Sequence, residues 1–288
     1  MEWLPENYQG AWTLGRSVSR EGICLHSGEH STVTLSPSVA PGINFVWAGE
    51  EGLTELINPN KVVSTQLCTT LRLGNKTLST VEHLFGALIG CGVTHVQIKV
   101  SGEEIPLLDG SAIGWVEAIK EAGLESVKSE QRKILELKKP LIIHKGRSVI
   151  TATPADSFSL IGIIDFPYPA IGQQSFSIDL TPRKFVDQIA PARTFGFKDQ
   201  IDQLREQGLI KGGSLENSLV CDDNFWVNPP LRFQNEPVRH KLLDLIGDLA
   251  LVGLPKAQVL VYRGSHALHV ELAAAFLKDS FSKQPSFD

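Results

Sequence analysis

The chain has 288 residues, a length that suits one large domain or two ordinary ones with a substantial core. Hydrophobic residues make up 42% of the chain and charged residues 20%, a composition typical of soluble globular proteins. A net charge of -5 and an isoelectric point near 5.9 argue against a nucleic-acid binder that relies on phosphate neutralisation.

Strands and helices are expected along most of the chain. The predicted strands are 32–35, 95–100, 141–143, 149–152 and 258–262, and the predicted helices are 80–90, 115–122, 182–189, 200–207, 236–251 and 268–283. A charged, weakly apolar run over residues 121–132 separates a strand-rich first half from a second half with the same general order. We interpret it as the linker between two α+β halves, although self-similarity of the sequence is too weak to show a duplication.

The cysteines and the N-terminus bear on the cellular location. Cys24, Cys68, Cys91 and Cys221 are scattered without a Cys-x-x-Cys pair, which favours buried thiols in a reducing compartment over disulfides or a thiolate zinc site. The first ten residues lack the basic and apolar regions of a secretory signal, and no stretch has the length of a membrane span. We therefore expect a cytoplasmic protein without stable membrane insertion.

The first chemical motif is Glu82-His83, near the start of the helix predicted over residues 80–90. Ser79 or Thr80 is suited to the N-cap position, and Glu82 would then be the acid of a capping box. Alternatively, one group binds a metal while the other accepts a proton, as the Glu does in His-Glu-x-x-His peptidases. This segment by itself leaves both interpretations open.

The helix predicted over residues 236–251 carries the strongest single pattern. His240, Asp244 and Asp248 are spaced four residues apart, so at about 100° per residue they fall along one stripe, successive members offset by about 40°. Their flanking residues are mostly leucine and isoleucine, so much of the stripe should be buried, where charges need partners or a metal. A surface hydrogen bond between His and Asp explains this pattern equally well on its own.

A third motif, Gly264-Ser265-His266-Ala267, follows the predicted strand 258–262. A residue just past a strand end is well placed to point into a cleft. Together the three motifs supply two imidazoles and a carboxylate for a metal, a second carboxylate as a base, and a further imidazole as an acid. These are the components of a zinc hydrolase.

Five segments carry a resemblance to a known family. They are Ser-Thr-Val-Glu-His-Leu at 79–84, Glu-Ile-Pro-Leu-Leu-Asp-Gly-Ser-Ala at 104–112, Ala-Arg-Thr-Phe-Gly-Phe at 192–197, Gly-Gly-Ser at 212–214 and Arg-His-Lys-Leu-Leu-Asp-Leu-Ile-Gly-Asp-Leu at 239–249. In this order they strongly resemble the UDP-3-O-acyl-N-acetylglucosamine deacetylases, the zinc amidases at the committed step of lipid A synthesis. The resemblance runs from about residue 22 to about residue 272.

The resemblance implies an α+β fold of two similar β-α-α-β halves, packed helix layer to helix layer with the active site between them. We expect an N-terminal domain over residues 1–126 and a C-terminal domain over residues 133–288, with an acyl-passage insert at about 190–220. The implied reaction is hydrolysis of the acetamide of UDP-3-O-(3-hydroxyacyl)-N-acetylglucosamine to the free amine and acetate. We expect a monomer whose partner is this small-molecule substrate.

The chemistry of the motifs matches the family's catalytic groups. His83, His240 and Asp244 offer two nitrogens and one oxygen to zinc and leave a fourth position open, as a catalytic site requires. The same donor set admits ferrous iron. Glu82 is expected to act as the base toward the attacking water. Thr194 matches the family residue whose hydroxyl helps to polarise the acetamide carbonyl.

Further matches concern the acid and the substrate. His266 matches the second acid-base residue, and Asp248 matches the acid that orients and charges it. This chain has His269 where family members often have Asn, and we assign the acid to His266 rather than to His269. Lys241 matches a lysine near the sugar and nucleotide phosphates, and Phe166 matches an aromatic that stacks on uracil.

Six apolar residues match positions that line the family's acyl-chain passage, which must hold a fatty acyl group away from water. They are Leu25, Phe197, Ile201, Ile210, Leu215 and Val220. Without the resemblance, we would interpret each as ordinary core.

Two alternative functions remain. A zinc amidase of another acylated amino sugar would share the metal ligands but need not keep Thr194, Phe166 or the apolar series around Phe197. A noncatalytic binding homologue would be expected to have lost Glu82 or a metal ligand, and this chain retains all of them.

Overall fold

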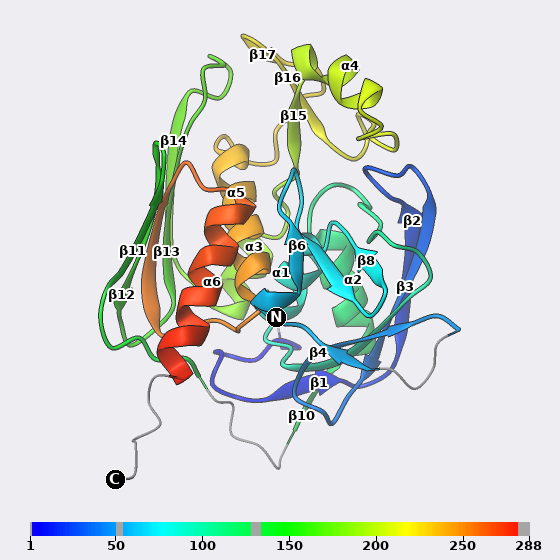
Figure 1. Ribbon diagram of the computed structural model, residues 1–288, viewed down its shortest axis with the longest axis vertical. Coiled ribbons are helices and arrows are strands. Elements are labelled where there is room, and N and C mark those ends of the chain that lie inside the picture. The colour runs from blue at the N-terminus through cyan, green and yellow to red at the C-terminus, as the bar shows by residue number, and fades with distance from the viewer. Residues whose placement is uncertain (1, 50–53, 128–133, 282–288) are drawn as a thin grey trace.

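Two five-stranded sheets and six α-helices dominate the described part of the chain. The structure is a computed structural model that describes residues 2–49, 54–127 and 134–281. Figure 1 shows α1, α3, α5 and α6 in the middle of the molecule, with one sheet on either side. The fold is therefore of the mixed α+β class that the sequence predicts.

The first sheet has the strand order β2-β3-β9-β4-β5. Its strands are β2 (Val18–Ile23), β3 (His30–Pro37), β9 (His95–Val100), β4 (Gly42–Trp47) and β5 (Glu55–Leu56). β9 pairs antiparallel with β3 and parallel with β4. Burial alternates along β3, where Val33 and Leu35 are buried, so one face of this sheet packs on the core.

The second sheet repeats this arrangement with the order β11-β12-β18-β13-β14. Its strands are β11 (Leu141–Lys145), β12 (Ser148–Pro154), β18 (Ala257–Tyr262), β13 (Ser159–Asp165) and β14 (Gln173–Asp179). As in the first sheet, only one neighbouring pair is parallel, here β18 with β13. The two sheets therefore agree in strand order and in strand direction.

Short strands form three smaller sheets beside these two. One pairs β1 (Trp12–Leu14) with β10 (Leu124–Ser126). The second has the order β6 (Val62–Ser64), β7 (Thr70–Leu73), β8 (Lys76–Leu78), and the third has the order β15 (Phe195–Phe197), β16 (Leu219–Asp222), β17 (Phe225–Trp226). A 3-10 turn, η1 (Pro59–Lys61), precedes β6.

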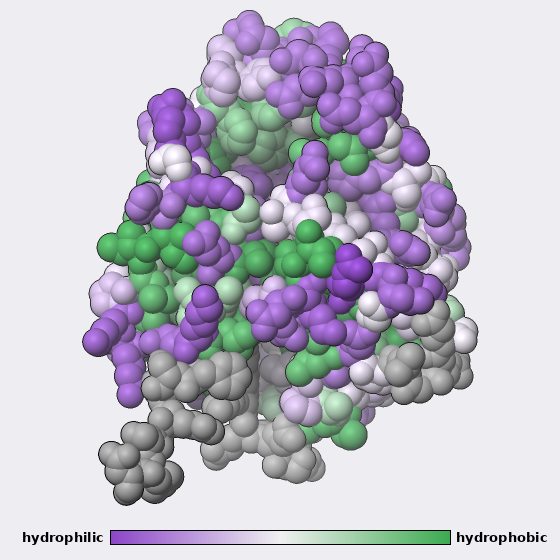
Figure 2. Space-filling model, viewed as in Figure 1, coloured by the Kyte–Doolittle hydropathy of each residue, from purple (hydrophilic) through white to green (hydrophobic). Residues whose placement is uncertain are grey.

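The sequence predicts all six helices to within two residues at each end. They are α1 (Glu82–Gly90), α2 (Ile113–Ala122), α3 (Pro182–Gln188), α4 (Lys198–Glu206), α5 (Glu236–Leu249) and α6 (His266–Phe281). All nine residues of α1 are buried, whereas α4 has no buried residue. The outer surface of the α4 region is largely hydrophilic, as the top of Figure 2 shows.

The structure rules out the capping-box interpretation of Glu82. The N-cap position of α1 is Val81, and no side chain caps this helix, so neither Ser79 nor Thr80 is an N-cap. The hydroxyl of Thr80 instead donates to Glu104 Oε1 at 3.0 Å, and Glu82 accepts from a backbone N–H outside the helix rather than closing a capping box. Thr80 and Glu82 therefore each form a hydrogen bond with a residue outside α1 instead of capping its first turn.

The expected linker is shorter than the run of residues 121–132. Its first two residues end α2 and Leu124–Ser126 forms β10, while residues 128–133 lie outside the described part. Leu124 packs against the hydrophobic core, which explains why this charged run is not a linker throughout. The four cysteines are free and buried, as predicted. None of the described helices is both long and apolar enough to cross a membrane.

Candidate active site

The site is built where α1 crosses α5 at very short range. A methyl group at Gly247 would lie 2.0 Å from the carbonyl oxygen of Glu82, and one at Gly86 would lie 2.7 Å from Leu243 Cδ1. Only glycine permits so close an approach, because any Cβ would collide with the facing helix. The first turn of α1 is thereby held against the middle of α5.

This crossing brings His83 to the stripe of α5 that carries His240 and Asp244. Asp244 Oδ1 lies 3.4 Å from His240 Nε2 and 3.7 Å from His83 Nε2. The two rings stand nearly perpendicular, with centroids 4.9 Å apart. Ligands at 2.0–2.1 Å from a tetrahedral zinc ion lie about 3.3 Å apart, so these three atoms fit a metal ion. We call His83, His240 and Asp244 the metal cluster.

Charge and hydrogen bonding also suit the metal cluster to a cation. Burial lowers the pKa of His240 to about 4, so its imidazole is neutral and has a lone pair to donate. His240 Nδ1 lies 3.0 Å from the Ala192 carbonyl oxygen, and an N–H donated there leaves Nε2 free for a metal. Burial acts to raise the pKa of Asp244, but Lys241, whose Nζ donates to Oδ2 at 2.6 Å, holds it well below its usual range.

A second cluster lies one helical turn further along α5. Asp248 Oδ2 is 2.8 Å from His266 Nδ1 and 2.9 Å from His269 Nδ1, and its Oδ1 accepts from Thr69 Oγ1 at 2.5 Å. Both imidazoles turn the same atom toward one carboxylate oxygen, so hydrogen bonds hold this group together. We call Asp248, His266 and His269 the acid cluster.

The two imidazoles of the acid cluster carry different charges. Burial acts to lower the pKa of His266, but the negative charges of Asp248 and Glu82 outweigh it and raise that pKa to about 9. Burial lowers the pKa of His269. At neutral pH His266 is therefore an imidazolium beside a neutral His269.

Glu82 stands between the two clusters. Its Oε2 accepts from the backbone N–H of Thr69 at 3.1 Å, and its Oε1 lies 3.9 Å from His266 Nε2. Burial raises the pKa of the Glu82 carboxyl, although the neighbouring imidazoles act in the opposite direction. A buried carboxylate of this kind is a stronger base than an exposed one.

Both clusters open onto a cavity of about 310 Å³. Glu82, His83, His240, Asp244 and His266 line it, and so do the expected substrate residues Lys241, Phe166 and Thr194. His269 is fully buried and lines no part of it. Of the two candidate histidines, only His266 thus faces the space that a substrate would occupy.

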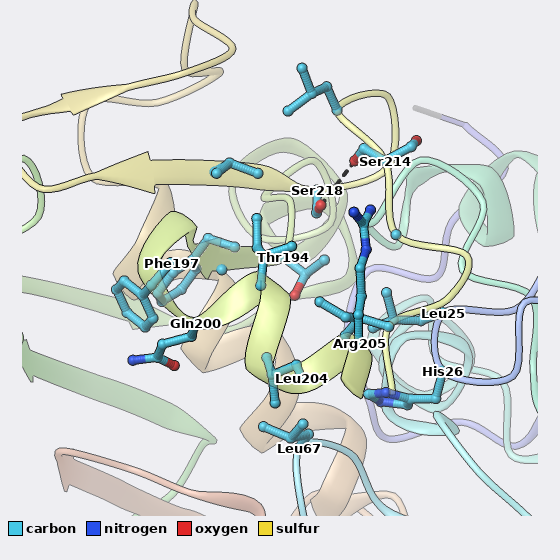
Figure 3. A pocket seen from close by; sticks show the side chains of 17 residues that line it. Leu25, His26, Leu67, Thr194, Phe197, Gln200, Leu204, Arg205, Ser214 and Ser218 are labelled. Carbon is cyan, nitrogen blue, oxygen red and sulfur yellow. Dashed lines mark hydrogen bonds between the residues drawn. The ribbon is translucent and has the colours of Figure 1, made fainter. Parts of the chain in front are cut away.

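Figure 3 shows the residues that line a second, more apolar cavity of about 280 Å³. All six residues expected in the acyl passage line it, namely Leu25, Phe197, Ile201, Ile210, Leu215 and Val220. Leu25, Leu67 and Thr194 belong to the walls of both cavities, so the two cavities adjoin. The sequence had left ordinary core as the alternative for these six, and the structure instead brings them to one cavity wall.

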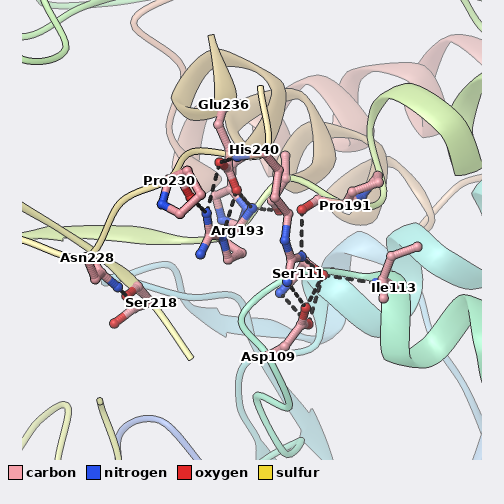
Figure 4. A network of polar contacts seen from close by, with 12 residues as sticks. Asp109, Ser111, Ile113, Pro191, Arg193, Ser218, Asn228, Pro230, Glu236 and His240 are labelled. Carbon is pink, nitrogen blue, oxygen red and sulfur yellow. Dashed lines mark hydrogen bonds and ion pairs between the residues drawn. The ribbon is translucent and has the colours of Figure 1, made fainter. Parts of the chain in front are cut away.

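A network of ionic contacts fixes the segment that carries Thr194 (Figure 4). Glu236 is fully buried, and its Oε1 accepts from both the backbone N–H and the Nε of Arg193 at 2.9 Å, while Oε2 accepts from the backbone N–H of Arg232 at 2.6 Å. The backbone N–H of Thr194 donates to the Gly110 carbonyl at 2.7 Å. Thr194 is therefore anchored on both sides.

Several residues at the site carry no signal in the sequence. Thr69 contacts both Glu82 and Asp248, and Thr65, Leu67 and Cys68 line the catalytic cavity. They belong to the β6–β7 connection, which none of the sequence motifs includes. Leu67 has a positive φ of 63°, which is unusual for leucine, and no Gly or Asn in this connection indicates such a turn in the sequence.

Comparison with known proteins agrees with this geometry. The family described as LpxC, UDP-3-O-acyl N-acetylglycosamine deacetylase, matches residues 11–278. A UDP-3-O-acyl-N-acetylglucosamine deacetylase of Thermosynechococcus vestitus is 47% identical over 266 residues, which cover 91% of this chain and 92% of that protein.

Relatives with similar coverage occur in other organisms. A deacetylase of the same description from a Nostoc species is 45% identical over 92% of this chain and 97% of its own length. A protein of Arabidopsis thaliana described as probable UDP-3-O-acyl-N-acetylglucosamine deacetylase 1, mitochondrial, is 39% identical over 93% of this chain and 88% of its own length. The chain therefore belongs to the LpxC family of deacetylases.

Proposed function

We propose that this chain hydrolyses the acetamide of a UDP-3-O-(3-hydroxyacyl)-N-acetylglucosamine to the free amine and acetate, the committed step of lipid A synthesis. One observation carries the proposal: the metal cluster, a buried base and an imidazolium all open onto one cavity that adjoins an apolar one. Family membership supports the same reaction.

His83, His240 and Asp244 would hold the metal ion, for which we propose zinc, with ferrous iron also suited to these donors. A metal bound there supplies positive charge that polarises the amide carbonyl and makes water more acidic. The neutral imidazole of His240 and the ionised Asp244 are ready to bind a cation without first losing a proton.

Glu82 would accept the proton of the attacking water, because it is a buried carboxylate directly beside the metal cluster. His266 would stabilise the negative charge on the amide oxygen and then protonate the departing amine. Asp248 would keep His266 charged and correctly turned through their 2.8 Å hydrogen bond. The hydroxyl of Thr194 would donate to the carbonyl oxygen.

The remaining assignments concern the substrate. Lys241 lines the catalytic cavity, and its ammonium would contact the sugar and phosphates. Phe166 lies in the same wall, where it would stack on uracil. The apolar cavity would enclose the acyl chain, whose transfer out of water favours binding.

We also propose that the molecule consists of two matched halves, residues 1–126 and 133–288, packed through their helices. The agreement of the two sheets in strand order and direction supports this division. The active site would then lie between the halves, with α1 contributing from one and α5 from the other. A monomeric state and a cytoplasmic location stay predictions from the sequence.

An assay of the purified protein with the acylated UDP-sugar tests the function. We expect release of acetate and free amine, loss of activity with a chelator, and recovery when Zn²⁺ is added. His144→Ala changes an exposed histidine on β11 and should behave like the wild type. Faster hydrolysis of an acylated amino sugar without UDP would favour the other amidase, and no hydrolysis of either would contradict the proposal.

A further inference from the structure

His269 is a buried imidazole that has no role in the proposed reaction. It belongs to the same face of α6 as His266, three residues later, and none of its surface is exposed. Neither the catalytic nor the apolar cavity includes it in its wall. Any effect of His269 on catalysis must therefore pass through another residue.

That residue is Asp248, whose hydrogen-bonding capacity is nearly filled by its neighbours. A carboxylate oxygen has two lone pairs, and those of Oδ2 face His266 Nδ1 at 2.8 Å and His269 Nδ1 at 2.9 Å. Oδ1 accepts from Thr69 Oγ1. The plane of the carboxylate is thus fixed from two sides, with His269 occupying one of the two positions on Oδ2.

We propose that His269 is a positioning residue: its Nδ1–H holds Asp248 in the orientation that aims His266 at the catalytic cavity. This inference rests on the proposed function, because it assigns His269 a part in the same reaction. Without His269, one lone pair of Oδ2 would be buried and unsatisfied, and the carboxylate could turn away from His266.

The surroundings of His269 suit a neutral donor. Besides Asp248, the charged groups that face it are Lys241 and His266, both cationic, and burial favours the uncharged imidazole further. Its Nε2 has no hydrogen-bond partner among the described residues, so the single ring proton is best used at Nδ1 toward Asp248. His269 therefore orients Asp248 without adding a second positive charge beside His266.

Covalent geometry provides a matched pair of variants. Asn carries its amide nitrogen on Cγ, as His carries Nδ1, so His269→Asn can keep the hydrogen bond, whereas His269→Leu fills the site without a donor. We expect His269→Leu to lower kcat by about 10-fold or more, the usual effect of losing such an outer partner, with KM and metal content unchanged. His269→Asn should recover most of this loss.

Two outcomes would overturn the proposal: a His269→Leu enzyme with wild-type kcat, or equal loss of kcat in the Leu and Asn variants. NMR provides a second test, which does not depend on enzyme activity. NMR of the ¹⁵N-histidine-labelled protein should show two protected imidazole N–H protons bonded to Asp248 in the wild type and one in His269→Leu. An inactive wild type would contradict the proposed function, while these spectra would still test the hydrogen bond.

Gly264 gives an independent way to disturb His269. A methyl group at this position would lie 2.7 Å from His269 Nε2 and 2.8 Å from Val261 Cγ2. Asn lacks the outer ring atoms, so Gly264→Ala should lower kcat more in the wild type than in the His269→Asn background, where only the contact with Val261 remains. Equal losses in both backgrounds would show that the substitution acts elsewhere, and this would contradict the proposal.

Discussion

The metal cluster and the acid cluster contain the same residue types, two histidines and one aspartate. Their geometry and protonation nevertheless suit one to binding a cation and the other to donating a proton. In the metal cluster the facing atoms lie 3.4 and 3.7 Å apart, and burial lowers the pKa of His240 to about 4. In the acid cluster the corresponding distances are 2.8 and 2.9 Å, and acidic neighbours raise the pKa of His266 to about 9 despite burial.

The difference follows from where each imidazole places its proton. His240 can donate Nδ1–H to the Ala192 carbonyl, so its other nitrogen faces Asp244 as a lone pair. His266 and His269 instead turn Nδ1 toward Asp248 and leave it no oxygen free for a cation. The two clusters have the same composition, so the orientation of their imidazole rings decides which one suits a metal and which one suits a proton donor.

Removal of a metal ligand should have the largest effect. Asp244→Ala takes away the carboxylate of the metal cluster, so we expect loss of bound metal together with loss of activity. Elemental analysis of the freshly purified protein measures the first effect. Asp248→Ala is the matched change in the acid cluster and should slow the reaction while keeping the metal. Full metal occupancy in Asp244→Ala would show that the clusters are assigned wrongly.

Glu82→Gln tests the group between the clusters. A neutral amide cannot accept a proton, so the rate should fall by a factor on the order of 100 or more, with metal content unchanged. Steady-state kinetics beside metal analysis separates the two quantities. Turnover near that of the wild type would remove Glu82 from the mechanism.

His266→Ala should retain metal, lose most of its rate, and change the pH profile. His266 acts as an imidazolium, so the rate should fall as the pH rises through about 9 in the wild type. Its folded-state pKa lies above the usual 6.5, so its stabilising contribution is complete below pH 6.5 and disappears as the pH rises through about 9. The variant should lose or shift this alkaline limb, and an unaltered limb would assign the acid elsewhere.

Gly247→Ala should have a smaller and more selective effect. The new methyl group would meet the Glu82 carbonyl and push α1 from α5, which separates His83 from its co-ligands but leaves Asp248 and His266 in place. Overpacking of this kind costs about 1–3 kcal/mol of stability. Thermal unfolding and metal affinity should both fall, whereas Gly196→Ala, with open space around it, should change neither.

Local periodicity explains why much of the site could be predicted. Four-residue spacing on a helix places His240, Asp244 and Asp248 on one stripe whatever the rest of the fold does. The separation of that stripe into two clusters depends on His83 and His266, which other elements bring to it. Periodicity carries no information about such tertiary contacts.

Tertiary contacts also decide several features that the sequence leaves open or does not indicate. Glu82 had a plausible local partner in a capping box, but a backbone N–H thirteen residues earlier in the chain binds it instead. The strands of the two smaller sheets beside the site are two to four residues long, too short for alternation to identify them. His266 and His269 differ in exposure to the cavity, which the sequence cannot show.

The glycine contact between α1 and α5 has a consequence for how this enzyme can change over time. Because backbone touches backbone at Gly247, no interposed side chain sets the distance between Glu82 and the metal cluster. Core leucines of these helices other than Leu243, which packs on Gly86, can then be replaced by apolar residues of similar volume while the catalytic spacing stays constant. Substitutions in the core should therefore accumulate without changing the geometry of the catalytic residues. A library that varies the core but keeps both glycines should retain many active members.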